Sequence, residues 1–408
     1  MTTHRSNVRL LYIARCLRGF GDGFAVIIVP AYLSAIGLTP IEIGLVATAS
    51  LLGTAVFTLL IGVIAPRRDL RSMALLGAAL MVLTGVALPS FEHVALIAGV
   101  AFVGTINPST GDIGVLVPLE HALLARSIAD TERTRTFARY SLIGALSMAT
   151  GALAAGATDF LLAWGLSSLA AFKLMFYLYA LLGVMAAAVY QRLPRSPAEL
   201  SRPVAPLGPS RHVVYKLAAL FSLDAFAGGF IVQSLLALWL FEKFELSLAA
   251  ASVFFFWSGV LSAFSYPVAA WIAGRVGLIN TMVFTHIPSS IFLIVAAFVP
   301  NLYAVLALLL VRSALSQMDV PTRTSYVMAV VTPAERPAAA SVTAVPRSLA
   351  SSASPALAGV LFGLPFSGLP FVICGALKIA YDIALLVSFR HIKPPEERAR
   401  ARPIALKG

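Results

Sequence analysis

Long apolar segments, each long enough to cross a bilayer as a helix, recur along the whole chain and alternate with short polar stretches. None of them shows the alternation of apolar and polar residues that is typical of membrane β-strands. The pattern predicts twelve transmembrane helices, at residues 10–35, 41–65, 72–89, 94–122, 136–160, 169–191, 213–240, 248–273, 279–299, 302–329, 338–363 and 369–390. The predicted fold class is therefore an all-α integral membrane protein.

The composition agrees with a membrane protein and changes how the charge is interpreted. The 408 residues are 59% hydrophobic and only 12% charged, whereas a soluble domain carries about 25% charged residues. The net charge of +12 would suggest nucleic acid as the partner of a soluble chain, but in a membrane protein it first indicates orientation. We therefore predict the lipid bilayer, and no nucleic acid, as a partner.

Basic residues gather in every second loop. If the N-terminus is cytoplasmic, the loops on that side carry most of the loop arginines, and the opposite loops offer little besides Lys243. The positive-inside rule then places both termini in the cytoplasm. No cleavage site follows the first apolar segment, which indicates a retained helix, and the Ala- and Arg-rich composition favours a bacterial inner (cytoplasmic) membrane.

A loop rich in proline, arginine and serine divides the chain near its middle, and a segment repeats on either side of it. The segments "ERTRTFARYSLIGALSMATGALAAG" (132–156) and "ERPAAASVTAVPRSLASSASPALAG" (335–359) have the same length and the same ends. Such repetition is typical of two related halves. The predicted organisation is an N-terminal six-helix bundle (1–191), a cytoplasmic linker (192–212), a C-terminal six-helix bundle (213–390) and a basic cytoplasmic tail (391–408).

Over essentially its whole length the chain resembles the major facilitator superfamily. The family's signature after helix 2, G-x-x-x-D-R-x-G-R-[RK], is matched by Gly62, Arg67 and Arg71, with a proline in place of the acid. The helix 5 signature, G-P-x-x-G-G, is similar to residues 151–156, which lack the proline, and to residues 354–359, which keep it. Glu-Arg pairs also stand after helices 4 and 10, as in the family's loops.

This resemblance implies a secondary transporter of twelve helices in two pseudo-symmetric six-helix bundles, with a substrate cavity lined mainly by helices 1, 4, 7 and 10. It implies alternating access by a monomer without a cofactor. Loop residues either gate this movement or only set the topology; they are Arg67, Arg71, Arg275, Glu132, Arg133, Glu335 and Arg336.

One aspartate lies in each of the four helices expected around the cavity, namely Asp22, Asp112, Asp224 and Asp319. Such acids either serve transport or pair with basic residues and hold the helices together. Arg18 and Asp22 are four residues apart, as are Asp319 and Arg323, so each pair can neutralise itself within one helix.

Asp112 and Asp224 have no basic residue three or four positions away. Unless Arg312 or Arg347 reaches them from a neighbouring helix, burial favours their protonated form, and they are the preferred proton carriers. With these, the predicted substrate and proton pathway comprises Arg18, Asp22, Asn107, Asp112, Asp224, Gln233, Arg312, Asp319, Arg323 and Arg347.

Three further polar features receive structural interpretations. Glu120 and His121 are interpreted as a solvated end of helix 4. Lys378 and Asp382 on helix 12 are interpreted as a packing pair. Prolines beside Asn107 and Asp319 predict kinks in helices 4 and 10.

Phosphate-loop, H-E-x-x-H and paired C-x-x-C motifs are missing from the sequence, so we predict neither an enzyme nor a metal site. The predicted function is alternating-access transport of a small solute, as proton-coupled export of an organic compound. The alternatives are proton-coupled uptake of a nutrient or metabolite, export of a metal or inorganic ion, and a non-transporting membrane sensor on a carrier fold. The predicted partners are a small-molecule substrate, protons and lipid.

Overall fold

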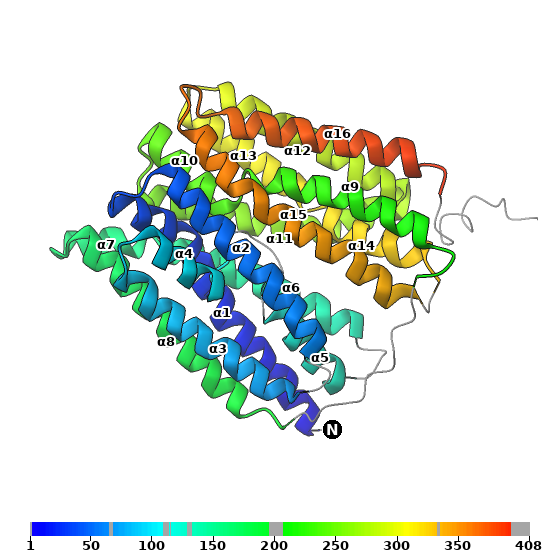
Figure 1. Ribbon diagram of the computed structural model, residues 1–408, viewed down its shortest axis with the longest axis horizontal. Helices are drawn as coiled ribbons and strands as arrows, with labels where there is room; N and C mark the ends of the chain where they lie inside the picture. Colours follow the sequence, from blue (N-terminus) through cyan, green and yellow to red (C-terminus); the bar gives the residue numbers. More distant parts are fainter. Residues whose placement is uncertain are drawn as a thin grey trace, which may run out of the picture. The chain divides into compact units, whose positions relative to one another are not determined.

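The computed structural model describes residues 2–64, 68–108, 114, 116–128, 133–195, 207–332 and 335–392, which form helices joined by turns and loops (Figure 1). In the first half the elements are α1 (Thr2–Ala35), α2 (Pro40–Ile64), α3 (Leu70–Ala87), the short 3-10 helix η2 (Leu88–Ser90), α4 (Val94–Val103), α5 (Val117–Ser127), α6 (Arg133–Ala154), α7 (Ala157–Ala163) and α8 (Ser168–Gln191). In the second half they are α9 (Arg211–Gly229), α10 (Gln233–Phe244), α11 (Leu248–Val276), α12 (Leu278–Phe298), α13 (Leu302–Ser316), α14 (Asp319–Val330), α15 (Arg336–Phe362) and α16 (Leu369–Phe389).

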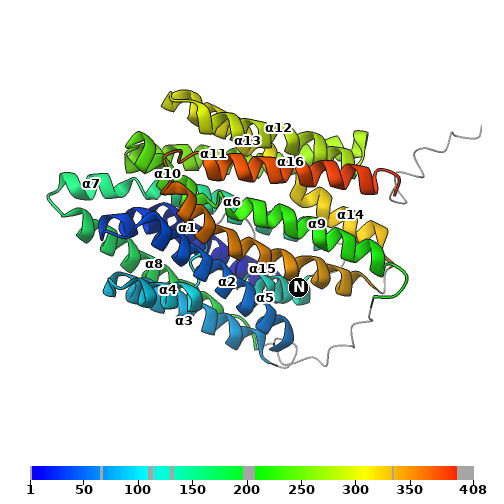
Figure 2. The same cartoon turned by 45° about the horizontal axis from the view of Figure 1, so that its top comes forward.

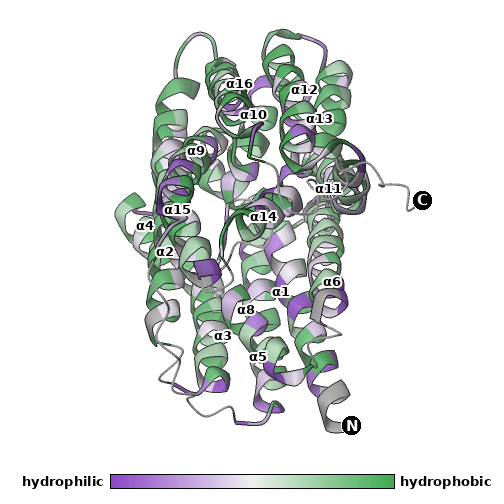
Figure 3. Ribbon diagram, turned by 90° about the vertical axis from the view of Figure 1, so that its right-hand side faces the viewer, coloured by the Kyte–Doolittle hydropathy of each residue, from purple (hydrophilic) through white to green (hydrophobic). Residues whose placement is uncertain are grey.

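All twelve predicted spans correspond to helical segments. Within the described residues, ten helical segments are long and apolar enough to cross a membrane. The other two spans are the α4–α5 pair and α15, which carries many alanines and serines in place of larger apolar residues. Most of the helical ribbon in Figure 3 has the colour of apolar residues, and the all-α membrane class is confirmed.

Within the described residues, three of the four helices expected around the cavity are interrupted. The breaks separate α4 from α5, α9 from α10, and α13 from α14. Helix α4 ends at Val103, where the C-cap residue Gly104 has an extended ψ of −179°, and the residues that follow up to Pro108 are not helical. Pro321 lies in the first turn of α14, where a proline is tolerated. The predicted kinks in helices 4 and 10 are confirmed. In helix 7 the structure shows a break that the sequence analysis does not predict.

The contacts within the chain define two compact units. Unit 1 consists of Met1–Ser201, Gly229–Ala263 and Ser352–Pro370, and unit 2 consists of Arg202–Gly228, Phe264–Ser351 and Phe371–Gly408. Residues 196–206 of the predicted linker and residues 393–408 of the predicted basic tail lie outside the described part of the chain. Each unit has its own apolar core.

Helix α1 packs along α6 and α8 in unit 1, and α3 runs beside α8 (Figures 1 and 2). The backbones of α1 and α6 approach so closely that a Cβ on Gly23 would lie 2.0 Å from the Met148 carbonyl oxygen. A Cβ on Gly151 of the first helix 5 signature would lie 2.0 Å from the Phe20 oxygen. The absence of a side chain at Gly23 and Gly151 therefore permits this close helix contact.

The two copies of the helix 5 signature make corresponding contacts inside unit 1. The end of the first copy, Gly156, lies against Ala249 at the start of α11. The end of the second copy, Gly359, lies against α2, where an added Cβ would be 2.5 Å from the Pro40 carbonyl oxygen. The backbone N–H of Ala356 also donates to Thr48 Oγ1 at 3.0 Å. Each repeat end thus packs on the first turns of a helix from the opposite half of the sequence.

Candidate functional site

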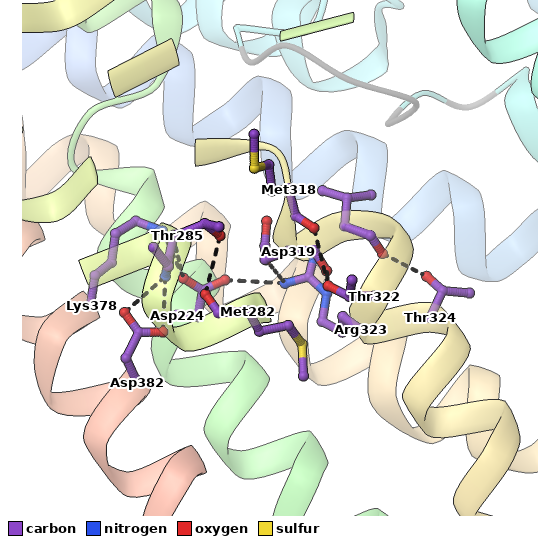
Figure 4. Close-up of polar contacts among 12 residues, drawn as sticks. Asp224, Met282, Thr285, Met318, Asp319, Thr322, Arg323, Thr324, Lys378 and Asp382 are labelled. Atoms are coloured by element: carbon purple, nitrogen blue, oxygen red, sulfur yellow. Dashed lines mark hydrogen bonds and ion pairs between the residues drawn. The ribbon is translucent and has the colours of Figure 1, made fainter. Parts of the chain in front are cut away.

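A network of ionisable side chains is buried in unit 2, with Asp224 of α9 at its centre (Figure 4). Asp224 Oδ1 accepts a hydrogen bond from Lys378 Nζ at 2.6 Å, and Oδ2 accepts one from Arg323 Nη1 at 3.2 Å. The expectation that Asp224 is unpaired is therefore wrong. Its partners come from α16 and α14, which the spacing of residues along one helix does not reveal.

Arg323 bridges two carboxylates. Its Nη1 is 3.1 Å from Asp319 Oδ2, four residues earlier in α14, so this predicted pair is confirmed. The same nitrogen reaches Asp224, and the guanidinium lies over the Phe221 ring, 5.5 Å from its centroid. Two carboxylates around one guanidinium satisfy a buried cation, which would otherwise be costly.

The network continues to a histidine that the sequence analysis does not single out. His286 of α12 is 2% exposed, and its Nε2 lies 3.3 Å from Lys378 Nζ. Its Nδ1 is 3.1 Å from both carboxylate oxygens of Asp382. Lys378 and Asp382 therefore have different partners, which corrects their interpretation as a packing pair. A lone histidine inside an apolar span is the signal that could have found His286.

A second buried cluster, here called the Glu120 cluster, lies in unit 1. Glu120 of α5 is 0% exposed and is hydrogen-bonded by Arg18 and by the hydroxyl groups of Tyr140 and Tyr190, the last at 2.5 Å. The interpretation of Glu120 as a solvated helix end is therefore wrong, because three donors hold it in the interior. The ion-pair partner of Arg18 is thus Glu120 rather than Asp22.

Asp22 lies on a polar pocket within unit 1. Its Oδ1 accepts a hydrogen bond from Tyr179 at 3.1 Å, and Tyr179 is also 3.0 Å from Thr105 Oγ1. Within the described residues Asp22 forms no ion pair, although Arg18 and Arg15 lie near enough to interact with its charge. The polar residues that line the pocket are Arg15, Arg18, Asp22, Thr105, Asn107 and Tyr179.

The breaks in helices 4 and 7 meet in unit 1. The backbone N–H of Ser234, in the first turn of α10, donates to the Pro108 carbonyl at 3.1 Å, a group released by the break after α4. Asn107 beside it is 3% exposed. The side-chain oxygen of Gln233 is buried and has no hydrogen-bond partner in the described part of the chain. Predicted pathway residues from helices 4 and 7 are thus brought together.

The remaining residues of the predicted pathway are Arg312, Arg347 and Asp112, and within the described part of the chain neither arginine forms an ion pair with the two buried clusters. Arg312 of α13 and Arg347 of α15 form no ion pair with a described acidic residue, although Arg347 lies within electrostatic range of Arg323 and Asp224. The Nε of Arg347 is buried without a hydrogen-bond partner among the described residues. Asp112 lies outside the described residues.

The predicted gating residues lie at helix ends where they are described. Arg71 is in the first turn of α3, Arg275 stacks on Trp271 at 3.8 Å, and Arg336 Nε donates to the Met328 carbonyl at 3.2 Å. Arg133 begins α6. Arg67 and Glu132 lie outside the described residues.

Glu335 joins the loop before α15 to the residues before α9 in unit 2. Its carboxylate accepts hydrogen bonds from Thr332 Oγ1 at 2.7 Å, Ser210 Oγ at 2.7 Å and the Gly208 N–H at 2.6 Å. These hydrogen bonds lower the pKa of Glu335 from its ordinary 4.5 to about 2, and the hydrogen bond from Thr332 has the largest effect.

Acidification should therefore loosen this junction. Because the pKa of Glu335 is lower in the folded state, its stabilising contribution is complete above pH 4.5 and is lost as the pH falls towards about 2. We expect Glu335→Gln to lower the melting temperature at neutral pH and to reduce the loss of stability on acidification. Thermal unfolding of both proteins in detergent between pH 7 and pH 3 measures this difference. Parallel curves for the two proteins would contradict it.

Comparisons with known proteins agree with this architecture. A sequence model described as "Major Facilitator Superfamily" matches residues 11–223, just over half of the chain. The chain is 25% identical over 422 residues to the Saccharomyces cerevisiae "Uncharacterized membrane protein YJR124C", with 94% of each chain covered.

Solved structures are similar in fold at low sequence identity. The nucleoside transporter NupG has a TM-score of 0.72 at 13% identity, with 96% of this chain and 100% of that chain covered. The xylose transporter XylE from E. coli, in an inward-open conformation, has a TM-score of 0.72 at 13% identity, with 93% and 95% covered. The human organic anion transporter MFSD10 has a TM-score of 0.65 at 15% identity, with 94% and 99% covered. With twelve predicted spans, related halves and a matching family model, the chain belongs to the major facilitator superfamily of membrane transporters.

Proposed function

We propose that this chain is a proton-coupled carrier that exports a small polar organic compound as a monomer. The observation that supports the substrate class is the pocket where Arg18 and Asp22 lie together. The Nε–H of Arg18 has no hydrogen-bond partner among the described residues, so it is available as a donor. Asp22 supplies an acceptor on the same helix, and Thr105 and Asn107 add neutral polar groups.

This combination suits a solute that offers both hydrogen-bond donors and acceptors. A guanidinium binds carboxylate, phosphate or carbonyl oxygens, and a carboxylate binds hydroxyl or amine hydrogens. The structural neighbours are transporters of nucleosides, of xylose and of organic anions, which are all small polar organic solutes. Proton coupling is supported by the buried carboxylates of both units, since an acid inside a membrane is a common proton carrier.

The direction of transport rests on the helix 5 signature, which in the family is typical of antiporters. The contacts of Gly151 with α1 and of Gly156 with α11 fit a helix 5 that packs closely at this motif. We further propose a bacterial inner-membrane location with both termini in the cytoplasm, because the arginine-rich loops alternate with poorly charged ones. Labelling of a cysteine placed at Phe244 from outside intact cells, but not of one at Ala205, tests this orientation.

Proteoliposomes that contain a pH-sensitive dye test the carrier directly. We would add uridine, D-xylose, benzoate or ethidium outside vesicles whose interior is acidic. Export by antiport predicts that at least one of these probes raises the internal pH, because each solute molecule enters in exchange for a proton. A further fall in internal pH would show symport and favour uptake of a nutrient. Unchanged pH with all four probes would count against a proton-coupled carrier of these solute classes.

A variant pair connects this assay to the pocket. Asp22→Asn should weaken the response to the active probe, because Asp22 lines the pocket. Glu242→Gln is the matched control, since Glu242 is exposed on α10 and does not line the pocket. Equal responses from both variants would remove Asp22 from the solute site.

A further inference from the structure

His286 and Asp382 form a pair in the interior of unit 2, on helices that the family resemblance does not place around the cavity. They lie on α12 and α16, which correspond to the predicted spans 279–299 and 369–390. His286 is 2% exposed and Asp382 is 0% exposed, and the imidazole Nδ1 is 3.1 Å from each carboxylate oxygen. Because an ionised carboxylate is costly in such a place, the protonation of this pair requires an explanation.

The contacts of the imidazole determine which nitrogen carries its proton. Nε2 lies 3.3 Å from Lys378 Nζ, and the same Nζ lies 2.6 Å from Asp224 Oδ1. A lysine ammonium donates hydrogen bonds and cannot accept them, so Nε2 is the acceptor. The proton of a neutral His286 therefore resides on Nδ1 and is donated to Asp382. A continuous path of hydrogen bonds runs from Asp382 through His286 and Lys378 to Asp224.

The charges of this network do not balance when His286 is neutral. Among the described groups that are in direct contact, three carboxylates, those of Asp224, Asp319 and Asp382, face two cations, Arg323 and Lys378, while Arg347 acts from farther away on the end that holds Arg323, Asp224 and Asp319. Arg323 and Lys378 contact Asp224 and Asp319. Asp382 has only His286 as a hydrogen-bond partner among the described residues. The excess negative charge is therefore concentrated at the histidine end, where one added proton would neutralise it.

The groups around the pair come from several helices. Asp224 faces it from α9, and Lys378, Tyr381 and Cys374 belong to α16 itself. Arg323 and Asp319 of α14 lie near Tyr381. Arg347 of α15 acts on the Arg323 end of the network, and Arg312 of α13 lies near Cys374. The direct partners of the pair thus remain Lys378 and Asp224, which connect it to α9.

We propose that His286 and Asp382 together bind the proton that this carrier moves, and that Lys378 communicates its presence to Asp224. A proton from water adds to Nε2 of His286, the Nδ1 proton passes to Asp382, and the pair later releases one proton to the opposite side of the membrane. In the protonated pair Asp382 is a carboxylic acid that donates to Nδ1, and Nε2 of the neutral imidazole has become a donor that can no longer accept from Lys378. Lys378 is then held by Asp224 alone, which changes the restraint on α9. The proposal rests on the proton coupling proposed above and names its site.

Infrared spectroscopy tests proton binding without a transport substrate. In difference spectra of the purified wild-type protein between pH 5 and pH 8, we expect a carboxylic-acid C=O band from Asp382. The band should disappear in Asp382→Asn and shift in His286→Gln, which keeps a hydrogen-bond donor towards Asp382. His121→Gln, which replaces a histidine of α5 that contacts the rings of Phe137 and Tyr140, is the matched control and should leave the band unchanged. A spectrum of Asp382→Asn identical to that of the wild type would overturn the proposal.

Transport separates the failure of this inference from the failure of the proposed function. With the active probe of the liposome assay, His286→Gln should reduce proton-coupled movement by about tenfold, a typical coupling between sites, while exchange of the probe without a pH difference continues. If Asp382→Asn does not fold, the His286→Gln variant alone tests the proton site, in the infrared spectra and in the transport assay. If the wild type and the His286→Gln variant both couple probe transport fully to proton movement, only the proposed proton site is overturned. A wild type without proton movement would overturn the proposed function, and the infrared result would still decide whether the pair binds a proton.

Discussion

Replacement of Glu120 by glutamine is expected to cause the largest loss of folded protein of any single change in the N-terminal half. Glu120 is 0% exposed and Arg18 is 5% exposed, so the variant leaves a buried guanidinium without its carboxylate. Removal of one partner of a buried ion pair costs about 3–5 kcal/mol, a large part of the roughly 5–15 kcal/mol that stabilises a folded protein. The yield of monodisperse protein in detergent and its melting temperature measure the loss.

A second substitution identifies the cause of that loss. If the uncompensated charge of Arg18 is responsible, Glu120→Gln combined with Arg18→Gln should recover part of the melting temperature. Glu242→Gln is the control for a glutamate change at an exposed position of α10 and should behave like the wild type. A single Glu120→Gln variant with normal yield and stability would show that Arg18 does not depend on this carboxylate.

Asp224→Asn is expected to cause a similarly large loss in the C-terminal half. The change removes the carboxylate that contacts both Lys378 and Arg323. Arg323 keeps Asp319 as a partner, but Lys378 keeps only the neutral His286 nitrogen among its described contacts. The buried ammonium should therefore dominate a cost of about 3–5 kcal/mol, and Lys378→Gln in the same chain should recover part of it.

Asp319→Asn provides the matched comparison, because it removes one carboxylate from Arg323 but leaves Asp224 in place. Thermal unfolding should rank the variants with Asp224→Asn least stable, Asp319→Asn intermediate and the wild type most stable. A stable Asp224→Asn protein that loses only proton-driven transport would instead support the sequence-based view of Asp224 as an unpaired proton carrier. The two outcomes are distinguished by melting temperature before any transport is measured.

Features that depend on neighbouring residues in the sequence were predictable. Hydropathy alone identifies the spans, because a helix that crosses a bilayer needs about 20 apolar residues in succession. The prolines predict that helices 4 and 10 are interrupted, although the breaks begin after Val103 and Ser316, several residues before Pro108 and Pro321. The spacing of four residues predicts the contact of Asp319 with Arg323. The interruption of helix 7 at 230–232 was not predicted, since it contains no proline.

The partners of the buried charges could not be predicted in the same way. Helical periodicity shows which residues share a face of one helix, but it does not show which other helix covers that face. Arg18 meets Glu120, which lies 102 residues later, and Asp224 meets Lys378, which lies 154 residues later. By itself, therefore, the sequence determined a membrane transporter with acids in particular helices. The tertiary structure alone decided which acids are neutralised and by which partners, because ion pairs inside a bilayer depend on contacts between helices that are distant in the chain.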